Sequence, residues 1–192
     1  MWLGLGAVWA TLVVAGLFSL SRYSFAPGVR AAPPAQWPTA SHLARDPAEP
    51  TLVVVAHPRC ACTRATLAEL ARVLSHLEGK LKTYVVFSAE PGADAAWTDS
   101  DTVRQARRIP GVDVVLSQDE ARLFHGQVSG EAFLFSAAGE LVFSGGLTPS
   151  RGHEGDNPGK SAVLSYVLDG KTRTHDMPAF GCALEGPQSN PG

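Results

Sequence analysis

The chain has 192 residues, of which 45% are hydrophobic and 18% are charged. This length fits one folded domain with additional segments, and the composition excludes a disordered chain. Sixteen basic and 18 acidic side chains give a net charge of −2, which excludes nucleic-acid binding through bulk positive charge. Three cysteines are too few for a disulfide-rich scaffold or for a four-cysteine zinc site within one chain.

Residues 2–21 form an apolar run without a charged side chain. Twenty residues at a helical rise of about 1.5 Å span about 30 Å, the thickness of a bilayer core. A cleaved signal peptide would carry basic residues before the apolar run, whereas the first one here, Arg22, follows it. A buried globular helix would show a polar face. We therefore expect an uncleaved transmembrane anchor over residues 1–21.

The rest of the chain divides by composition. Residues 22–50 contain six prolines and no helical or strand periodicity, which predicts a semi-rigid tether. Residues 51–184 form the predicted folded domain. Residues 185–192 are expected to be a flexible tail.

The expected elements of the domain alternate between strand and helix. Residues 52–56 are a continuous apolar run, typical of a strand buried on both faces. Residues 63–78 place apolar side chains at helical spacing. Thr66 and Glu69 match a capping box, and the alternative is a helix that starts a few residues earlier. This order predicts an α/β fold with a mixed sheet flanked by helices. The other expected elements are strands at 83–87 and 112–116, helices at 98–108, 118–125 and 159–168, and a hairpin of 132–135 with 140–144.

Cys60 and Cys62 lie between the end of the first expected strand and the first expected helix. The macrodipole and the free N–H groups of a helix N-terminus favour an anion such as a thiolate. Arg59 and Arg64 add positive charge, and both effects lower the pKa of a thiol. The sequence thus predicts a reactive cysteine; two incidental buried thiols are the alternative.

A disulfide between Cys60 and Cys62 would be strained. In an extended strand, Cα atoms two residues apart are separated by about 6.6 Å, which is just within the disulfide range. In a helix the same two side chains point to nearly opposite faces. A bond between them would need a local turn and would be easily reduced.

The order of strand, cysteine pair, amphipathic helix, strand, hairpin and final helix resembles the thioredoxin-like superfamily. More narrowly, three motifs resemble the bacterial RedB-type, membrane-anchored thioredoxin-like proteins. They are His-Pro-Arg-Cys-Ala-Cys-Thr-Arg at 57–64, Ser-Arg-Gly-His-Glu-Gly-Asp-Asn at 150–157 and Phe-Gly-Cys at 180–182. The resemblance implies thiol–disulfide exchange without an organic cofactor, in which Cys60 attacks and Cys62 resolves.

The chain departs from the superfamily pattern at two places. The superfamily usually has Cys-x-x-Cys, and here one residue fewer separates the two sulfurs. The superfamily also has a cis-proline before the hairpin, which shapes the substrate groove and keeps metal off the sulfurs. The matching stretch here, residues 128–131, contains Gly130 and no proline. This absence favours a metal-binding alternative.

Three further residues are candidates for the site. Cys182 lies in an expected turn and would serve as a second resolving thiol or a third metal ligand, although packing or pairing with another chain would also explain it. The polar, Gly-rich loop 148–159 is expected to approach the cysteine pair, where His153 would shuttle protons or bind a soft metal. A solvated loop would carry the same residue types. His57 either tunes the thiol or ends the strand.

Three functions follow from these features. The leading one is a membrane-tethered thiol–disulfide oxidoreductase that acts on protein thiols or disulfides or on a redox partner protein. The second is a copper-binding or chaperone domain in which Cys60, Cys62 and His153 hold Cu(I), because thiolates are its preferred ligands. The third is a non-enzymatic interaction module.

The cues for localisation conflict. Thiol chemistry and the Pro-rich segment suggest a domain outside the cytoplasm, in the periplasm, where disulfides persist. Arg22 and Arg30 follow the apolar run, and the positive-inside rule weakly places the domain in the cytoplasm. Because two arginines are a small bias, we expect a single-pass membrane protein with an extracytoplasmic domain.

Overall fold

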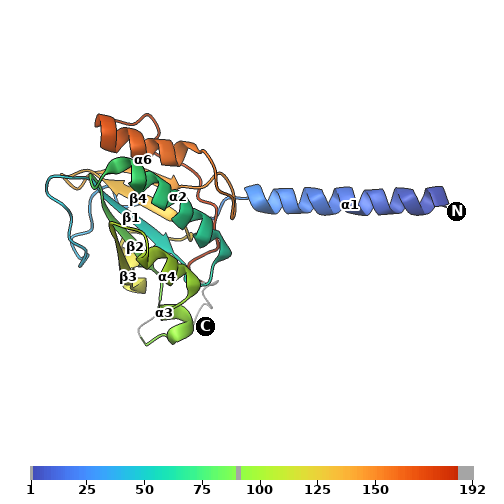
Figure 1. Ribbon diagram of the computed structural model, residues 1–192, viewed down its shortest axis with the longest axis horizontal. Coiled ribbons are helices and arrows are strands. Elements are labelled where there is room, and N and C mark those ends of the chain that lie inside the picture. Colours follow the sequence, from blue (N-terminus) through green and yellow to red (C-terminus); the bar gives the residue numbers. More distant parts are fainter. Residues whose placement is uncertain (1, 90–91, 186–192) are drawn as a thin grey trace.

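The computed structural model describes residues 2–89 and 92–185 (Figure 1). Five strands form one sheet in the order β3-β2-β1-β4-β5. The pairs β1–β2 and β2–β3 are parallel, whereas β1–β4 and β4–β5 are antiparallel. The expected mixed sheet is therefore confirmed. The strands are β1 (Thr51–Ala56), β2 (Lys82–Phe87), β3 (Val112–Leu116), β4 (Glu131–Phe135) and β5 (Leu141–Gly146).

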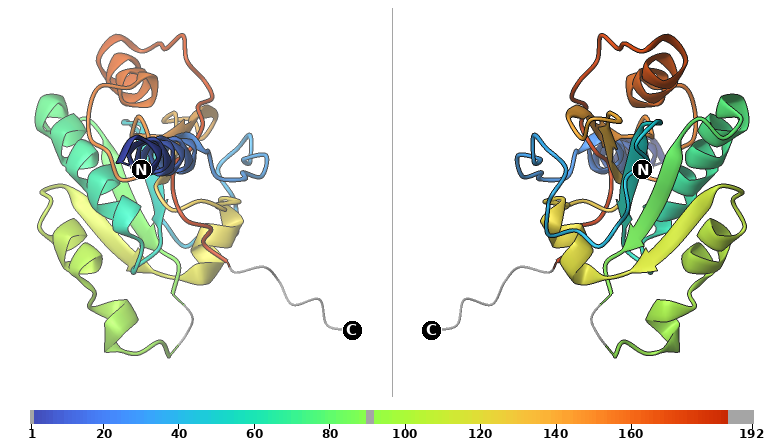
Figure 2. Two further views of the ribbon diagram at one scale, coloured as in Figure 1. Left: turned by 90° about the vertical axis from the view of Figure 1, so that its right-hand side faces the viewer. Right: turned by 90° about the vertical axis from the view of Figure 1, so that its left-hand side faces the viewer.

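Helices cover both faces of this sheet. Three helices, α2, α4 and α6, pack on one face, and the short helix α5 lies on the other (Figure 2). The expected α/β architecture is thereby confirmed. The helices are α1 (Trp2–Phe25), α2 (Ala61–Leu77), α3 (Ala95–Thr98), α4 (Asp101–Arg107), α5 (Gln118–Leu123) and α6 (Pro158–Asp169).

The central strand β1 is buried along its whole length. Because side chains alternate along a strand, Leu52 and Val54 join the core under α2, α4 and α6, while Val53 and Val55 join the core on the α5 side. Two cores therefore fix the position of β1. Its carboxyl end, where α2 begins, is held in the middle of the sheet.

The beginning of α2 differs from the expected capping box. The helix starts at Ala61 with Cys60 as its N-cap residue, so the alternative of an earlier start is confirmed, and Thr66 and Glu69 lie inside the helix and form no cap. Instead, the buried carboxylate of Glu69 lies 3.0 Å from Nζ of Lys160 in α6. Glu69 therefore joins two helices of the same layer.

The helix expected over 98–108 is divided into two. The short α3 ends at Thr98, and the Ser100 side chain accepts a hydrogen bond from the Val103 N–H to start α4. A serine in this position satisfies one of the free N–H groups at a helix start. The other expected helices and strands are present, and their ends differ from the expected ones by at most two residues.

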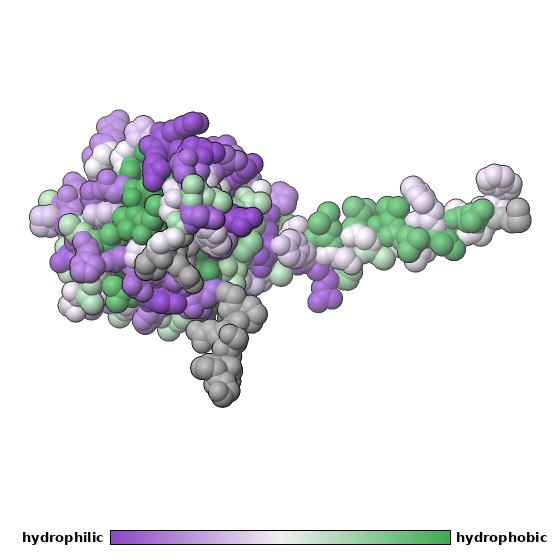
Figure 3. Space-filling view, turned by 90° about the horizontal axis from the view of Figure 1, so that it is seen from below, coloured by the Kyte–Doolittle hydropathy of each residue, from purple (hydrophilic) through white to green (hydrophobic). Residues whose placement is uncertain are grey.

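The N-terminal helix α1 stands away from the domain (Figures 1 and 3). Within the described residues it is the one helix long and apolar enough to cross a membrane, with 22 residues over Gly4–Phe25 and a mean hydropathy of 1.8. None of this span is buried in the domain. Its length and composition fit a single-pass anchor.

Much of the expected tether packs against the domain. Trp37 meets the rings of Phe124 and Phe135 edge-on, with centroids 5.0 and 5.2 Å away. The Ser41 hydroxyl donates a 2.7 Å hydrogen bond to the buried carboxylate of Glu120. These contacts make residues 28–50 part of the fold, although the division into anchor, tether and domain stays a prediction. Residues 186–192 of the expected tail lie outside the described part.

Replacing Trp37 with alanine should destabilise the domain by about 2 kcal/mol, because the two aromatic contacts and part of the α5-side core are lost. The measurement is the urea unfolding midpoint of the full chain in detergent. Val29→Ala is the matched control, since Val29 lies in the same segment and is 90% exposed. Equal midpoints for the two variants would show that the segment adds nothing to stability.

Candidate functional site

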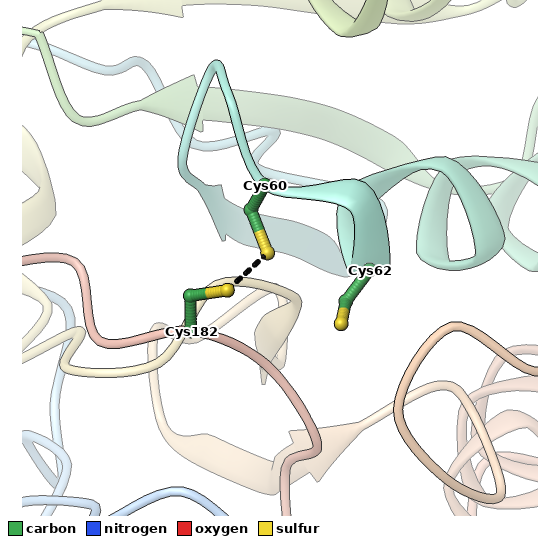
Figure 4. A group of neighbouring side chains, drawn as sticks. All are labelled: Cys60, Cys62 and Cys182. Carbon is green, nitrogen blue, oxygen red and sulfur yellow. Dashed lines mark hydrogen bonds between the residues drawn. The ribbon is translucent and has the colours of Figure 1, made fainter. Parts of the chain in front are cut away.

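Cys182, which is distant in sequence, meets the neighbouring Cys60 and Cys62 at the carboxyl end of β1 (Figure 4). All three are free thiols, and their sulfur atoms lie within 4.8 Å of one another. The Sγ atoms of Cys60 and Cys182 are only 2.9 Å apart, at hydrogen-bonding distance. Cys60 and Cys62 are buried, whereas Cys182 is exposed. The site thus contains a close pair of thiols and a third thiol beside it.

The junction of β1 and α2 positions the first two cysteines. The Cys60 N–H donates to the His57 carbonyl at 3.2 Å, and the Thr63 N–H donates to the Cys60 carbonyl at 3.1 Å. Cys60 is therefore held in a tight turn as the N-cap residue of α2. Cys62 follows in the first turn of the helix and points to the same cluster.

Cys182 reaches the cluster on the C-terminal strap, which we define as residues 175–184. The strap runs along the ends of β4 and β5 and makes backbone hydrogen bonds along its length. Its last part forms an isolated antiparallel bridge between Val128 and Ala183. The backbone hydrogen bonds are Ser144 N–H to His175 O (2.9 Å), Gly146 N–H to Pro178 O (3.2 Å), Ser129 N–H to Cys182 O (2.8 Å) and Leu184 N–H to Gln127 O (2.9 Å).

Glycines allow this close passage of two backbones. A Cβ atom on Gly181 would collide with the carbonyl oxygen of Ser129. Gly145 has φ +151°, and a Cβ there would lie 2.6 Å from the carbonyl oxygen of Met177. Only glycine combines this conformation with so close an approach. These two residues therefore determine how near the strap comes to Cys60.

Ser129 and Gly130 link the strap to the β1–α2 junction. The Ser129 hydroxyl accepts a 2.9 Å hydrogen bond from the His57 N–H and lies 2.8 Å from Oγ1 of Thr63. The Gly130 N–H donates to the carbonyl of Val55 at 2.8 Å. Gly130 has φ +91°, and a Cβ there would meet the Thr66 hydroxyl. No sequence pattern predicts the roles of Ser129 and Thr63, because their hydrogen bonds join distant segments.

The three thiols differ in proton affinity. Burial raises the pKa of Cys60, but hydrogen bonds from Cys182 and from the N–H groups of Cys62 and Thr63 outweigh it, so the pKa is lowered overall. Burial and the hydrogen bond to Cys60 raise the pKa of Cys182 to about 12. Burial and the charge of Cys60 raise that of Cys62. Cys60 is therefore the thiol of the cluster that ionises most readily, and Cys182 holds its proton more tightly.

His57 and Arg59 order the loop before Cys60. The His57 ring lies edge-on to Trp97, with centroids 5.0 Å apart, and its Nδ1 accepts a 3.1 Å hydrogen bond from the Arg59 N–H. Burial and the nearby Arg59 charge lower the pKa of His57, so the ring is neutral at pH 7. The Arg59 guanidinium lies 5.9 Å from the Trp97 ring centroid. Both residues also border the turn that holds Cys60.

Arg64 and His153 have other neighbours. Arg64 forms an exposed ion pair with Asp101 at 3.2 Å. Nδ1 of the exposed His153 lies 2.7 Å from the Arg151 carbonyl oxygen, and His153 lines a surface pocket with Leu20 and Phe25 of α1. Across residues 2–89 and 92–185, the group of metal-ligating atoms within 4.8 Å of one another contains the three cysteines and not His153.

The neighbouring Arg151 does reach the strap. Its Nη1 donates to the carbonyl of Gly181, the residue before Cys182. Its charge also favours the ionised forms of Cys62 and Cys182. The loop 148–159 therefore contributes an arginine near the cysteines, and the Gly-rich polar composition of this loop was the available signal.

A surface pocket of about 400 Å³ borders Cys60. Arg59 and Arg64 contribute basic side chains to its wall, and Asp101 contributes an acidic one. The remaining lining comes from the β1–α2 turn, the start of α2, Ala96 of α3 and the start of α4. Cys60 therefore lies next to an opening in which a reacting group has room.

Strands β3, β2 and β1 are parallel, β4 and β5 form an antiparallel hairpin, and a cysteine pair lies at the start of the helix after β1. This arrangement identifies the fold. The fold is thioredoxin-like. A crystal structure of a hypothetical protein from Sinorhizobium meliloti superposes with a TM-score of 0.61 at 20% identity, covering 86% of this chain and 97% of the other. An uncharacterized conserved protein from Geobacillus kaustophilus gives 0.57 at 17% identity, covering 86% and 94%.

A thioredoxin-like protein in its oxidized form aligns with a lower TM-score of 0.46 at 13% identity, over 78% of this chain and 97% of the other. No protein-family model matches the chain, and no curated protein matches its sequence significantly. The narrower resemblance to the RedB-type proteins stays a prediction.

Replacing Cys182 with alanine should raise the pKa of Cys60, because the thiolate loses the hydrogen bond that Cys182 donates. The pH dependence of Cys60 alkylation by iodoacetamide, followed by mass spectrometry, should move to higher pH. Cys182→Ser is the matched control, since its hydroxyl still donates and should keep the profile near that of the original protein. Identical profiles for the alanine and serine variants would contradict this role of Cys182.

Proposed function

We propose that the protein is a thiol–disulfide oxidoreductase in which Cys60 is the nucleophile and Cys182 the resolving thiol. The observation that carries this proposal is the 2.9 Å separation of their sulfur atoms, with the lowered pKa on Cys60. A thiolate is the attacking species in disulfide exchange, and a thiol beside it completes the exchange.

The reaction proceeds in two exchanges. In the first, the Cys60 thiolate attacks one sulfur of a substrate disulfide, forms a mixed disulfide and releases the other sulfur as a thiolate. In the second, Cys182 loses its proton and attacks Sγ of Cys60, which releases the second substrate sulfur. The substrate gains two electrons, and the protein is left with a Cys60–Cys182 disulfide. An external dithiol then restores the two thiols, and the reverse sequence oxidises a substrate dithiol.

Ionisation within the cluster supports this order of events. Cys60 is ionised most easily, so it attacks first. Once Cys60 is bonded to substrate, its negative charge is gone, and that charge is one cause of the raised pKa of Cys182. Formation of the mixed disulfide therefore lowers the cost of ionising Cys182, which activates the resolving thiol at the step that needs it.

Cys62 is the less suitable resolving thiol. Burial and the adjacent Cys60 charge raise its pKa. It also lies in the first turn of α2, only two residues after the N-cap, where a disulfide to Cys60 would distort the start of the helix. The resemblance assigned the resolving role to Cys62, whereas the geometry supports Cys182.

The helix α1 supports a membrane-tethered form of this enzyme. We propose that Gly4–Phe25 spans the membrane once and that the domain faces the periplasm, where disulfides persist. Its partners are then proteins that carry a reactive disulfide or dithiol.

A second function is favoured by the third sulfur. Three cysteine sulfurs within 4.8 Å of one another suit a soft ion such as Cu(I), for which thiolates are preferred ligands. In this copper-binding candidate, Cys60, Cys62 and Cys182 hold the ion. Cys182 takes the place of His153, the third ligand that was expected from the sequence.

A redox titration separates the candidates. The full chain in detergent is equilibrated with glutathione buffers, and mass spectrometry identifies linked cysteines at each potential. The oxidoreductase should show a reversible Cys60–Cys182 link with a midpoint between about −120 and −270 mV, the range of thiol–disulfide catalysts. Cys62→Ser should retain this link, and Cys182→Ser should lose it.

Other outcomes would contradict the proposal. A link that persists below about −300 mV would indicate a structural disulfide. Absence of any link, with tightly bound copper and thiols protected from alkylation, would favour the copper-binding candidate. If a variant without cysteines kept full biological function, the non-enzymatic interaction module would be the remaining candidate.

A further inference from the structure

The membrane helix leaves the domain at the end that carries the thiol site. In Figure 1, α1 extends from the side of the domain where β1 ends and α2 begins. Cys60 is the N-cap residue of α2, and Cys182 contacts it there. The cysteine cluster and the last turn of α1 therefore lie at the same end of the molecule.

Arg151 connects this last turn to the strap. Its N–H donates to the Ser24 carbonyl at 2.9 Å, and its Nε donates to the Ala26 carbonyl at 3.1 Å. Its guanidinium also lies 5.1 Å from the ring centroid of Tyr23. The other end of the same guanidinium donates to the carbonyl of Gly181. A single side chain thus bridges the end of α1 and the residue before Cys182.

The chain after α1 has little freedom to move. The Gly28 N–H donates a 2.9 Å hydrogen bond to the strap carbonyl of Ala179. Arg30 donates to the Met177 carbonyl at 2.6 Å and pairs with Asp176 at 2.8 Å. Only residues 26 and 27 separate the end of α1 from these contacts. The domain is therefore held against the helix and does not hang on a long linker.

From this geometry we propose that the thiol site faces the bilayer surface and exchanges electrons with cysteines that an integral membrane protein presents close to that surface. This inference rests on the proposed thiol function and on insertion of α1. With Gly4–Phe25 in the bilayer, Arg151 and Gly181 lie next to the membrane–water boundary. A globular partner of ordinary size, about 30 Å across, has no room between the site and the lipid.

The partner is therefore a short, membrane-attached segment that carries a disulfide or dithiol. Such a segment reaches the site from the lipid side, whereas a disulfide held far above the bilayer does not. Sharing one membrane raises the effective concentration of two proteins only where geometry allows the sites to meet. Two partners on the same membrane that differ only in the height of their disulfide therefore distinguish a thiol site at the bilayer surface from simple membrane attachment.

The test uses the full chain in liposomes with two membrane-anchored disulfide probes. Both probes carry the same transmembrane helix and the same disulfide peptide at equal density. In the first, about five residues separate the disulfide from the bilayer; in the second, a rigid helical spacer of about 30 residues lifts it by about 45 Å. The reduced enzyme should react at least about tenfold faster with the short probe, since the long probe gains nothing from the shared membrane.

A small soluble disulfide, 5,5′-dithiobis(2-nitrobenzoate), is the reference reaction. Suppose that the small disulfide reacts normally but the two probes react at equal rates, or the long probe reacts faster. The proposed location of the site at the bilayer surface would then be wrong, and the thiol function would remain. Failure with the small disulfide as well would overturn the thiol function and this inference with it.

Discussion

The return of the C-terminal strap across the end of the sheet is the constraint on which the site depends. Cys60 and Cys182 are separated by 122 positions in the chain, yet their sulfurs are 2.9 Å apart. Backbone hydrogen bonds to Gln127, Ser129 and Gly146 fix the strap on both sides of Cys182. Because Gly181 passes so close to the Ser129 carbonyl, a larger residue there would move the strap away. Backbone contacts of the strap thus position Cys182, the resolving thiol of the proposed function.

Two buried carboxylates hold together the segments that surround the contact between Cys60 and Cys182. Glu131 is fully buried and lies 2.6 Å from Arg30, whose guanidinium also reaches Ser144 and the strap. Glu69 is buried as well and accepts hydrogen bonds from Lys160 and from the Gly155 N–H, which holds the loop that carries Arg151. Removing one partner of a buried ion pair leaves an uncompensated charge, which is costly. These ion pairs and hydrogen bonds therefore hold four segments together around the thiols. The segments are residues 28–50, the β4–β5 hairpin, the loop 148–159 and the strap.

Hydrophobic periodicity predicted most of the fold, whereas the contacts that complete the site are non-local. The strand 52–56 and the helix after it could be predicted because burial on two faces and helical spacing are local patterns. The contacts of residues 28–50 could not, since proline content indicates an extended spacer while a few side chains such as Trp37 pack into the core. Cys182 was a candidate because of its expected turn and the Phe-Gly-Cys motif, but its contact with Cys60 depends on hydrogen bonds between distant backbone segments, which local periodicity does not predict. His153 was expected near the pair, but Arg151 takes the inward position on the same loop.

The backbone of Gly130 explains the missing proline. The Gly130 N–H donates to Val55, and its φ of +91° lies far from the value near −65° that a proline ring imposes. Proline has no N–H, so a proline here would lose this hydrogen bond and distort the turn that presents Ser129 to Cys182. The N–H of the adjacent Ser129 is paired with the carbonyl of Cys182 on the strap. Gly130 thus keeps its bond to β1 while Ser129 beside it bonds the strap, and this pair of contacts places the sulfur of Cys182 within 4.8 Å of those of Cys60 and Cys62.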